Sequence, residues 1–217
     1  LESFPRSLCE LNLLTYLNLR GNKISTLPKQ IGNLKSLKSM DLRENDFKSL
    51  PESIRELSSL KMLLLGGNEL EDLPESVGEI ESLASISSED NHLSRLPRSL
   101  MELKKLKELD LSFNNLTHLP EWIGKLKTLK GLNLSFNRIK TIPETISRLR
   151  DLRFLGLGGN KLSEFPEFIK NLKSLEKLYI FNSNKNDSPA LINTLNNITD
   201  EKIVEYAQPS YIYSIAQ

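Results

Sequence analysis

The sequence predicts an α/β solenoid, a curved stack of similar short units with a parallel β-sheet on its concave face. Three observations lead to this prediction. Prolines recur every 23 residues from Pro5 to Pro189, asparagines keep the same step from Asn22 to Asn160, and leucine or isoleucine fills fixed places between them. A period of this length is typical of proteins in which each unit buries its apolar face only against its neighbours.

The repeating unit reads L-x-x-L-x-L-x-x-N-x-L-x-x-L-P-x-x-I-x-x-L-x-x, and seven full copies occupy residues 14–174. In each copy the alternating L-x-L run predicts a short strand whose leucines point inward. The asparagine follows where the chain turns out of the strand. Its amide can donate and accept hydrogen bonds, so stacked copies would satisfy buried backbone groups that strand pairing leaves free. These structural asparagines are Asn22, Asn45, Asn68, Asn91, Asn114, Asn137 and Asn160.

The second half of each unit predicts the convex face. Proline suits the first position of a helical turn, and the glutamate that often follows it lies where the helix dipole favours negative charge. Apolar residues spaced by three, such as Ile54, Leu57 and Leu60, fit a short helix or a 3₁₀ segment. This back wall needs more width per copy than the strands, so the stack is expected to curve with its strands on the inside.

The repeat phase also predicts how the chain is divided. Residues 1–182 form the solenoid: an N-terminal half-repeat over 1–13, seven full repeats over 14–174, and the start of an eighth from residue 175. Residues 183–217 are expected to form a degenerate last repeat and a C-terminal cap. The alternative is a tail that docks onto a partner or onto another copy, so the chain is expected to be a monomer or a weak dimer through this tail.

Composition excludes several functional classes. Among the 217 residues, 29 Lys and Arg balance 28 Asp and Glu, and a formal charge of +1 argues against a protein that coats nucleic acid or anionic membranes. No apolar run approaches the ~18 residues of a membrane span, so no membrane insertion is expected. Cys9 alone cannot form an intramolecular disulfide or a multi-cysteine metal site, and His92 and His118 leave little for general-base chemistry. We therefore predict a protein that is not an enzyme and needs no cofactor.

The unit resembles the leucine-rich repeat in its 23-residue L-P-x-x-I-x-x-L form. Its uniform copies are similar to the leucine-rich-repeat proteins of pathogenic leptospires, and also to intracellular eukaryotic proteins of the Ras-scaffold and Scribble type. The resemblance covers residues 1 to about 182. It implies a horseshoe that binds other proteins, and sometimes glycans, on its concave face. The leptospiral likeness implies a secreted or cell-surface bacterial protein that meets host molecules in adhesion or virulence, whereas the scaffold likeness implies a cytoplasmic signalling protein.

The residues that flank the inward leucines are expected to project from the concave face. Exposed apolar and aromatic side chains on a rigid sheet are typical of protein-recognition hot spots, which makes Leu64, Phe154, Tyr179 and Phe181 the strongest candidates. A neighbouring side chain or the C-terminal cap could instead cover each of them. The predicted partner-binding residues are Tyr16, Asn18, Asp41, Arg43, Met62, Leu64, Glu89, Glu108, Asp110, Asn133, Phe154, Tyr179 and Phe181.

Other residues allow alternative interpretations. Glu89, Asp90, Glu108 and Asp110 have the chemistry to hold Ca²⁺, but a solvated acidic surface is the simpler interpretation and no metal is predicted. Ser88 is the one polar residue in the leucine ladder and indicates a local cavity or a buried water.

The turns and the back edge carry two further features. Phe113 and Phe136 precede turn asparagines and are expected to pack over them. A basic band on the convex edge could bind sulfated glycans, although solvated cations would give the same pattern. Its predicted glycan-binding residues are Lys127, Lys130, Arg150 and Arg153.

Overall fold

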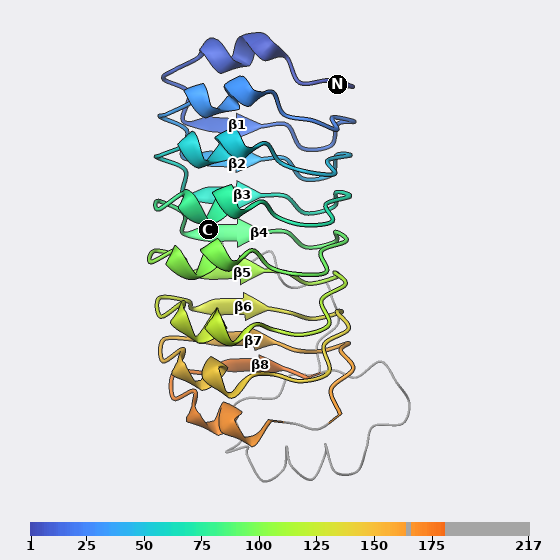
Figure 1. Ribbon diagram of the computed structural model, residues 1–217, viewed down its shortest axis with the longest axis vertical. Coiled ribbons are helices and arrows are strands. Elements are labelled where there is room, and N and C mark those ends of the chain that lie inside the picture. Colours follow the sequence, from blue (N-terminus) through green and yellow to red (C-terminus); the bar gives the residue numbers. More distant parts are fainter. Residues whose placement is uncertain (164–165, 181–217) are drawn as a thin grey trace.

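The computed structural model describes residues 1–163 and 166–180, and in these residues eight short strands alternate with eight 3₁₀ turns (Figure 1). The strands are β1 (Tyr16–Asn18), β2 (Ser39–Asp41), β3 (Met62–Leu64), β4 (Ser85–Ser87), β5 (Glu108–Asp110), β6 (Gly131–Asn133), β7 (Phe154–Gly156) and β8 (Lys177–Tyr179). The turns are η1 (Arg6–Glu10), η2 (Lys29–Asn33), η3 (Glu52–Glu56), η4 (Glu75–Glu79), η5 (Arg98–Glu102), η6 (Glu121–Lys125), η7 (Glu144–Arg148) and η8 (Glu167–Asn171). The predicted C-terminal cap, 183–217, lies outside the described residues.

The strands form one open parallel sheet in the order β1 to β8. The register advances by one full repeat at every step, so that Leu17 pairs with Met40 and Met40 with Leu63. Figure 1 shows the strands stacked in a column, with the 3₁₀ turns stacked in a second column that lies in front of them in this view. The predicted α/β solenoid, with a parallel sheet on one face and short turns on the other, is confirmed.

The back wall is built from turns of five residues, each preceded by proline. In η3, Pro51 is extended at φ −73°, and the turn closes where the backbone N–H of Leu57 donates to the carbonyl of Ile54. Few residues separate each proline from the next strand, and a segment this short favours the tight 3₁₀ geometry over a longer α-helix. In the described residues, all eight return segments adopt this form.

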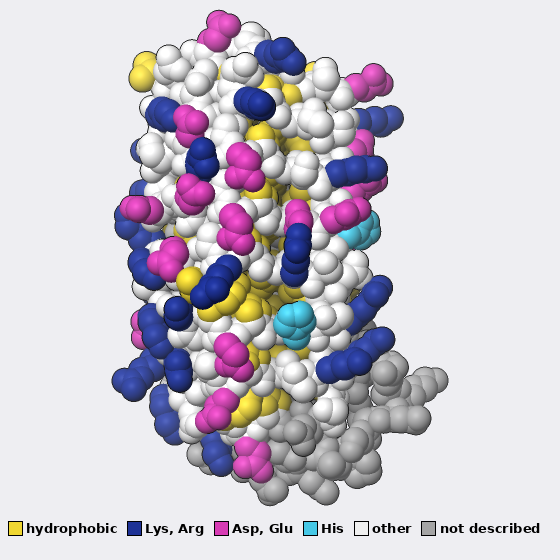
Figure 2. Space-filling model, viewed as in Figure 1, with side chains coloured by type: hydrophobic (Ala, Val, Ile, Leu, Met, Phe, Trp, Pro, Cys, Tyr) yellow, Lys and Arg dark blue, Asp and Glu magenta, His cyan; other side chains and the backbone are white. Residues whose placement is uncertain are grey.

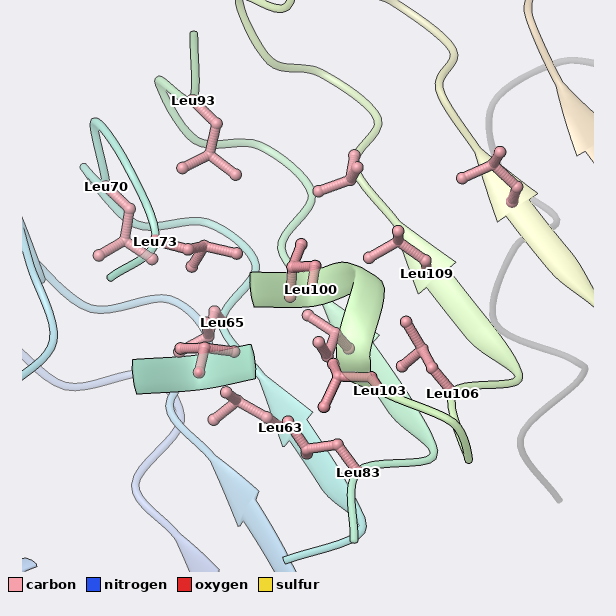
Figure 3. Close-up of a cluster of buried hydrophobic side chains, with 14 of the residues drawn as sticks. Leu63, Leu65, Leu70, Leu73, Leu83, Leu93, Leu100, Leu103, Leu106 and Leu109 are labelled. Carbon is pink, nitrogen blue, oxygen red and sulfur yellow. The ribbon is translucent and has the colours of Figure 1, made fainter. Parts of the chain in front are cut away.

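The core lies between the two columns and runs the length of the stack. Leucines from successive repeats meet there, as in the cluster around Leu63, Leu83, Leu103 and Leu106 (Figure 3). These four side chains are almost completely buried. Because no repeat encloses its own leucines, each is stabilised by the repeat before it and the repeat after it.

The turn asparagines join neighbouring repeats. The Asn45 side-chain amide donates to the carbonyl of Leu19 in the preceding repeat (2.8 Å) and of Leu42 in its own (3.1 Å), while its Oδ1 accepts the N–H of Ile24 (3.0 Å). The same three bonds recur at Asn68, Asn91, Asn114, Asn137 and Asn160. At the start of the stack, Asn22 donates to the carbonyl of Leu19 and accepts from the N-terminal amine. This ladder pairs buried backbone groups that the strands leave free.

Candidate binding surface on the strand face

The strand face consists of the side chains that project from the sheet on the side opposite the core. The register brings them into two rows along the stack, one from the first and one from the third residue of each strand. The first row is Tyr16, Ser39, Met62, Ser85, Glu108, Gly131, Phe154 and Lys177, and the second is Asn18, Asp41, Leu64, Ser87, Asp110, Asn133, Gly156 and Tyr179.

An aromatic pair lies on the last two strands. The rings of Phe154 and Tyr179 come from different rows and are tilted by 55° with their centroids 5.2 Å apart, and both side chains stay partly exposed. Their neighbours in the preceding strand are glycines, Gly131 beside Phe154 and Gly156 beside Tyr179, and the side chains of Glu108 and Asn133 fold over these two glycines. Phe181, predicted to belong to the same patch, lies outside the described residues.

The first three repeats carry a second set of accessible side chains. Tyr16 is 55% exposed, and its hydroxyl accepts a hydrogen bond from the Asn18 amide. Met62 and Leu64 are partly exposed in β3, one in each row. Apolar side chains are thus presented near both ends of the strand face.

Two residues predicted to contact a partner are instead buried, which corrects the prediction for them. Asp41 is 2% exposed because Arg43 covers it: Nε and an Nη of Arg43 donate to the two carboxylate oxygens at 2.9 and 2.6 Å. Burial alone would raise the pKa of Asp41, but these bonds and the Arg43 charge outweigh it and lower the pKa below its usual value. Asn133 is 3% exposed because its amide bonds to Asp110 and to the backbone of Ser135.

The middle of the strand face is acidic and partly buried. Asp110 Oδ1 accepts from the backbone N–H and the hydroxyl of Ser112, and Ser87 donates to Glu89. Glu108 folds over Gly131, where an added Cβ would collide with its carboxylate. Burial raises the pKa of all three carboxyls, Glu89, Glu108 and Asp110, above their usual values.

These carboxylates do not assemble a metal site. Within residues 1–163 and 166–180, no group of three or more His, Cys, Asp or Glu side chains is placed to hold an ion. Asp90 is exposed at the turn, and Glu89 folds over Gly66. The structure does not bring Glu89, Asp90, Glu108 and Asp110 together as one group of ligands, because the first two belong to the turn after β4 and the last two to β5.

Sequence analysis missed an aromatic stack beside the strand face. The rings of Phe113 and Phe136 stack on each other, with centroids 4.3 Å apart and planes at 10°. Their packing over the turn asparagines stays a prediction. Both have left-handed backbones, with φ near +55°, at a phase where Gly21, Gly67 and Gly159 occur in other repeats. Bulky residues rarely adopt this conformation, and such strain is concentrated at functional sites. A bulky residue at a glycine phase is the signal that could have located the stack.

The predicted basic band is only partly free. Arg153 is paired with Glu176 at 3.3 Å, and Lys127 donates to the carbonyl of Arg148 at 3.2 Å. Lys130 and Arg150 are exposed. Burial and the charges of Arg148 and Arg150 lower the pKa of Lys127, so cations are crowded at this edge.

Comparison with known proteins agrees with this architecture. The family model for a leucine-rich repeat region matches residues 4–116 and 97–206. None of the curated protein sequences matches the chain. In the described part of the chain, no helix has the length and apolar character needed to cross a bilayer.

Several solved structures are similar. A leucine-rich-repeat protein of Leptospira interrogans is 31% identical, with a TM-score of 0.74 over 94% of this chain and 58% of that one. An internalin of Listeria monocytogenes shares the fold at 24% identity, with a TM-score of 0.79 over 95% of this chain and 58% of its own. A plant peptide hormone receptor, solved in complex with RGF2, is 29% identical, with a TM-score of 0.71 over 84% of this chain and 34% of the receptor.

The chain therefore spans little more than half the length of the two bacterial proteins. The family model, however, covers most of the sequence, and the sheet, the turns and the asparagine ladder supply the structure that the motif requires. The chain belongs to the leucine-rich-repeat family.

Proposed function

We propose that the protein binds another protein on its strand face. The observation that supports this most directly is the placement of partly exposed apolar side chains on a rigid sheet: Met62 and Leu64 in β3, and the Phe154–Tyr179 pair in β7 and β8. Apolar anchors set among polar neighbours are typical of binding hot spots. Because strand pairing already fixes these residues, little conformational entropy is lost when a partner docks.

A double substitution tests the proposal. Leu64→Asp with Tyr179→Asp places a charge in each apolar region, and it should abolish capture of a partner that has been identified by affinity capture and then purified. The matched control is Gln30→Asp with Asn33→Asp, which adds the same two charges at exposed positions of η2 and should leave capture unchanged. Equal capture by the two double variants would contradict recognition on the strand face.

We further propose that the partner is a host protein and that the chain is exported by a bacterium to its surface or surroundings. The similarity to the Leptospira interrogans protein supports this proposal. The alternative is an intracellular scaffold that assembles signalling proteins. An export signal encoded ahead of Leu1 would support the first and contradict the second.

Binding of sulfated glycans is a second candidate function, favoured by the crowding of Lys127, Arg148 and Arg150. Charge reversal by Lys127→Glu with Arg150→Glu should then release the protein from immobilised heparin at lower salt. Unchanged retention would contradict this function.

A further inference from the structure

The back wall has an open groove where η5, η6 and η7 meet. Its volume is about 430 Å³. Figure 2 shows this side of the molecule, with a hydrophobic patch and basic side chains over η5 and η6. The residues that line the groove are Arg98, Met101, Glu121, Trp122, Lys125, Thr145 and Arg148.

Two large residues, Met101 and Trp122, line the groove, whereas the turns on either side of it bring a glycine against a serine or a threonine. At Gly78 and Gly124, an added Cβ would lie 2.3 Å from backbone atoms of Ser99 and Thr145 in the next repeat, so glycine lets those turns approach closely. Met101 has the phase of these glycines. Trp122 occupies, in the repeat after Met101, the position that Ser99 and Thr145 occupy in their own repeats.

This difference in bulk is visible in the packing. The turns η5 and η6 are packed less closely than η4 and η5, or than η6 and η7. Trp122 packs against the core and also lines the groove, so it is held in place while part of its surface stays accessible.

The groove is strongly basic at its rim. Arg98, Lys125 and Arg148 come from three successive turns, and none of them forms an ion pair with any residue between 1 and 163 or between 166 and 180. Lys125 Nζ lies 3.7 Å from Met101 Sδ, within the groove itself. Against these three cations the lining holds one carboxylate, Glu121.

We propose that this groove is a docking site for an acidic polypeptide segment that carries an apolar anchor residue. The anchor would lie against Trp122 and Met101, and flanking carboxylates would accept hydrogen bonds from Arg98 and Arg148, a charge-assisted contact that arginine makes well. Tryptophan, methionine and arginine are the residues in which protein interfaces are enriched. A sulfated glycan would satisfy the cations but has no apolar side chain to bury against Met101. The site lies on the opposite side of the solenoid from the strand face.

Fluorescence of Trp122, the single tryptophan of the chain, reports on the site directly. The probe is a random copolymer of glutamate and leucine, titrated into the full chain at low and at high salt, with poly-glutamate, heparin and a lysine–leucine copolymer as comparators. We expect the acidic copolymer to change the emission saturably, poly-glutamate to bind more weakly, the lysine copolymer to have no effect, and salt to weaken binding.

Two variants locate the binding. Arg98→Glu with Arg148→Glu should lower the affinity for the copolymer by at least about tenfold. Met101→Gly should also lower this affinity, because the apolar wall is lost. The matched control, Lys23→Glu with Lys161→Glu, makes the same change in net charge at exposed positions outside the groove and should bind as the unmodified protein does. Equal loss in the control, unchanged binding in either groove variant, or a stronger response to heparin than to the copolymer would overturn the proposal.

Discussion

The two sides of each repeat are built under different constraints. On the strand side, backbone hydrogen bonds and the asparagine ladder fix each repeat to the next in the same register from β1 to β8. On the back wall, no backbone hydrogen bond joins one described 3₁₀ turn to the next, and at Gly78 and Gly124 the lack of a side chain lets neighbouring turns approach closely. Outward residues can therefore vary on the strand face without moving the backbone, whereas a change in size on the back wall opens or closes a groove.

Loss of a ladder asparagine should have the largest effect. Asn114→Ala removes bonds to the carbonyls of Ser88 and Leu111 and to the N–H of Leu93. It leaves the buried N–H of Leu93 unpaired, while each carbonyl keeps one bond, from Asn91 and from Asn137. We expect the free energy of unfolding to fall by about 2–4 kcal/mol in urea denaturation. The neighbouring Asn115→Ala is the control and should change it by less than about 0.5 kcal/mol. Equal effects would show that the ladder does not hold the strand side together.

A large residue at a back-wall glycine should have the next largest effect. Gly78→Met forces η4 away from Ser99, as Met101 stands between η5 and η6, and should cost about 1–3 kcal/mol in the same assay. Arg55→Met is the control at the same repeat phase, and it loses only an exposed 3.9 Å pair with Glu79. If both variants unfold alike, side-chain bulk does not set the spacing of the turns.

Substitution of Ser88 tests the packing of the strand side at a position inside the core. Its side chain is fully buried, and its hydroxyl has no hydrogen-bond partner among the residues that the structure describes. Leucine occupies this phase in the neighbouring repeats, at Leu65 and Leu111, so Ser88→Leu should raise the free energy of unfolding by about 1–2 kcal/mol. A clear loss of stability would show that the hydroxyl makes a contact that the fold needs.

The smallest expected effect is the pH dependence of the acidic strand face. Burial raises the pKa of Glu89 and Asp110, so the folded state binds protons more readily than the unfolded state, and their contribution to stability is present at low pH and lost as the pH rises through the raised values. The Glu89→Gln and Asp110→Asn double variant should be more stable than the parent at neutral pH.

The difference should shrink as the pH falls toward about 4, the ordinary pKa of a carboxyl, and vanish at lower pH, where both groups are protonated in the folded and the unfolded chain alike. Asp41, whose pKa is lowered, makes stability depend on pH in the opposite sense. Because Asp41 is present in both proteins, its contribution cancels in the difference. Thermal unfolding of the two proteins across this range measures the difference, and a constant difference would contradict the burial of these groups.

Much of the fold could be predicted because its signals are local. The alternation around Leu17 and the spacing of Ile54, Leu57 and Leu60 report on strands and short turns within a few residues, and the constant period turns a local pattern into a stack. The sequence could also place Met62, Leu64, Phe154 and Tyr179 on the strand face, because their register follows from the repeat alone.

The rest depends on neighbours that differ from repeat to repeat. Whether Asp41 and Asn133 are exposed was decided by Arg43 and Asp110, and whether the turns leave a groove was decided by the pairing of Met101 with Trp122. The sequence by itself determined the architecture, since a regular phase of apolar residues has one efficient way to be buried. Only the tertiary structure decided which side chains stay accessible, since that depends on the size and charge of residues a whole repeat away.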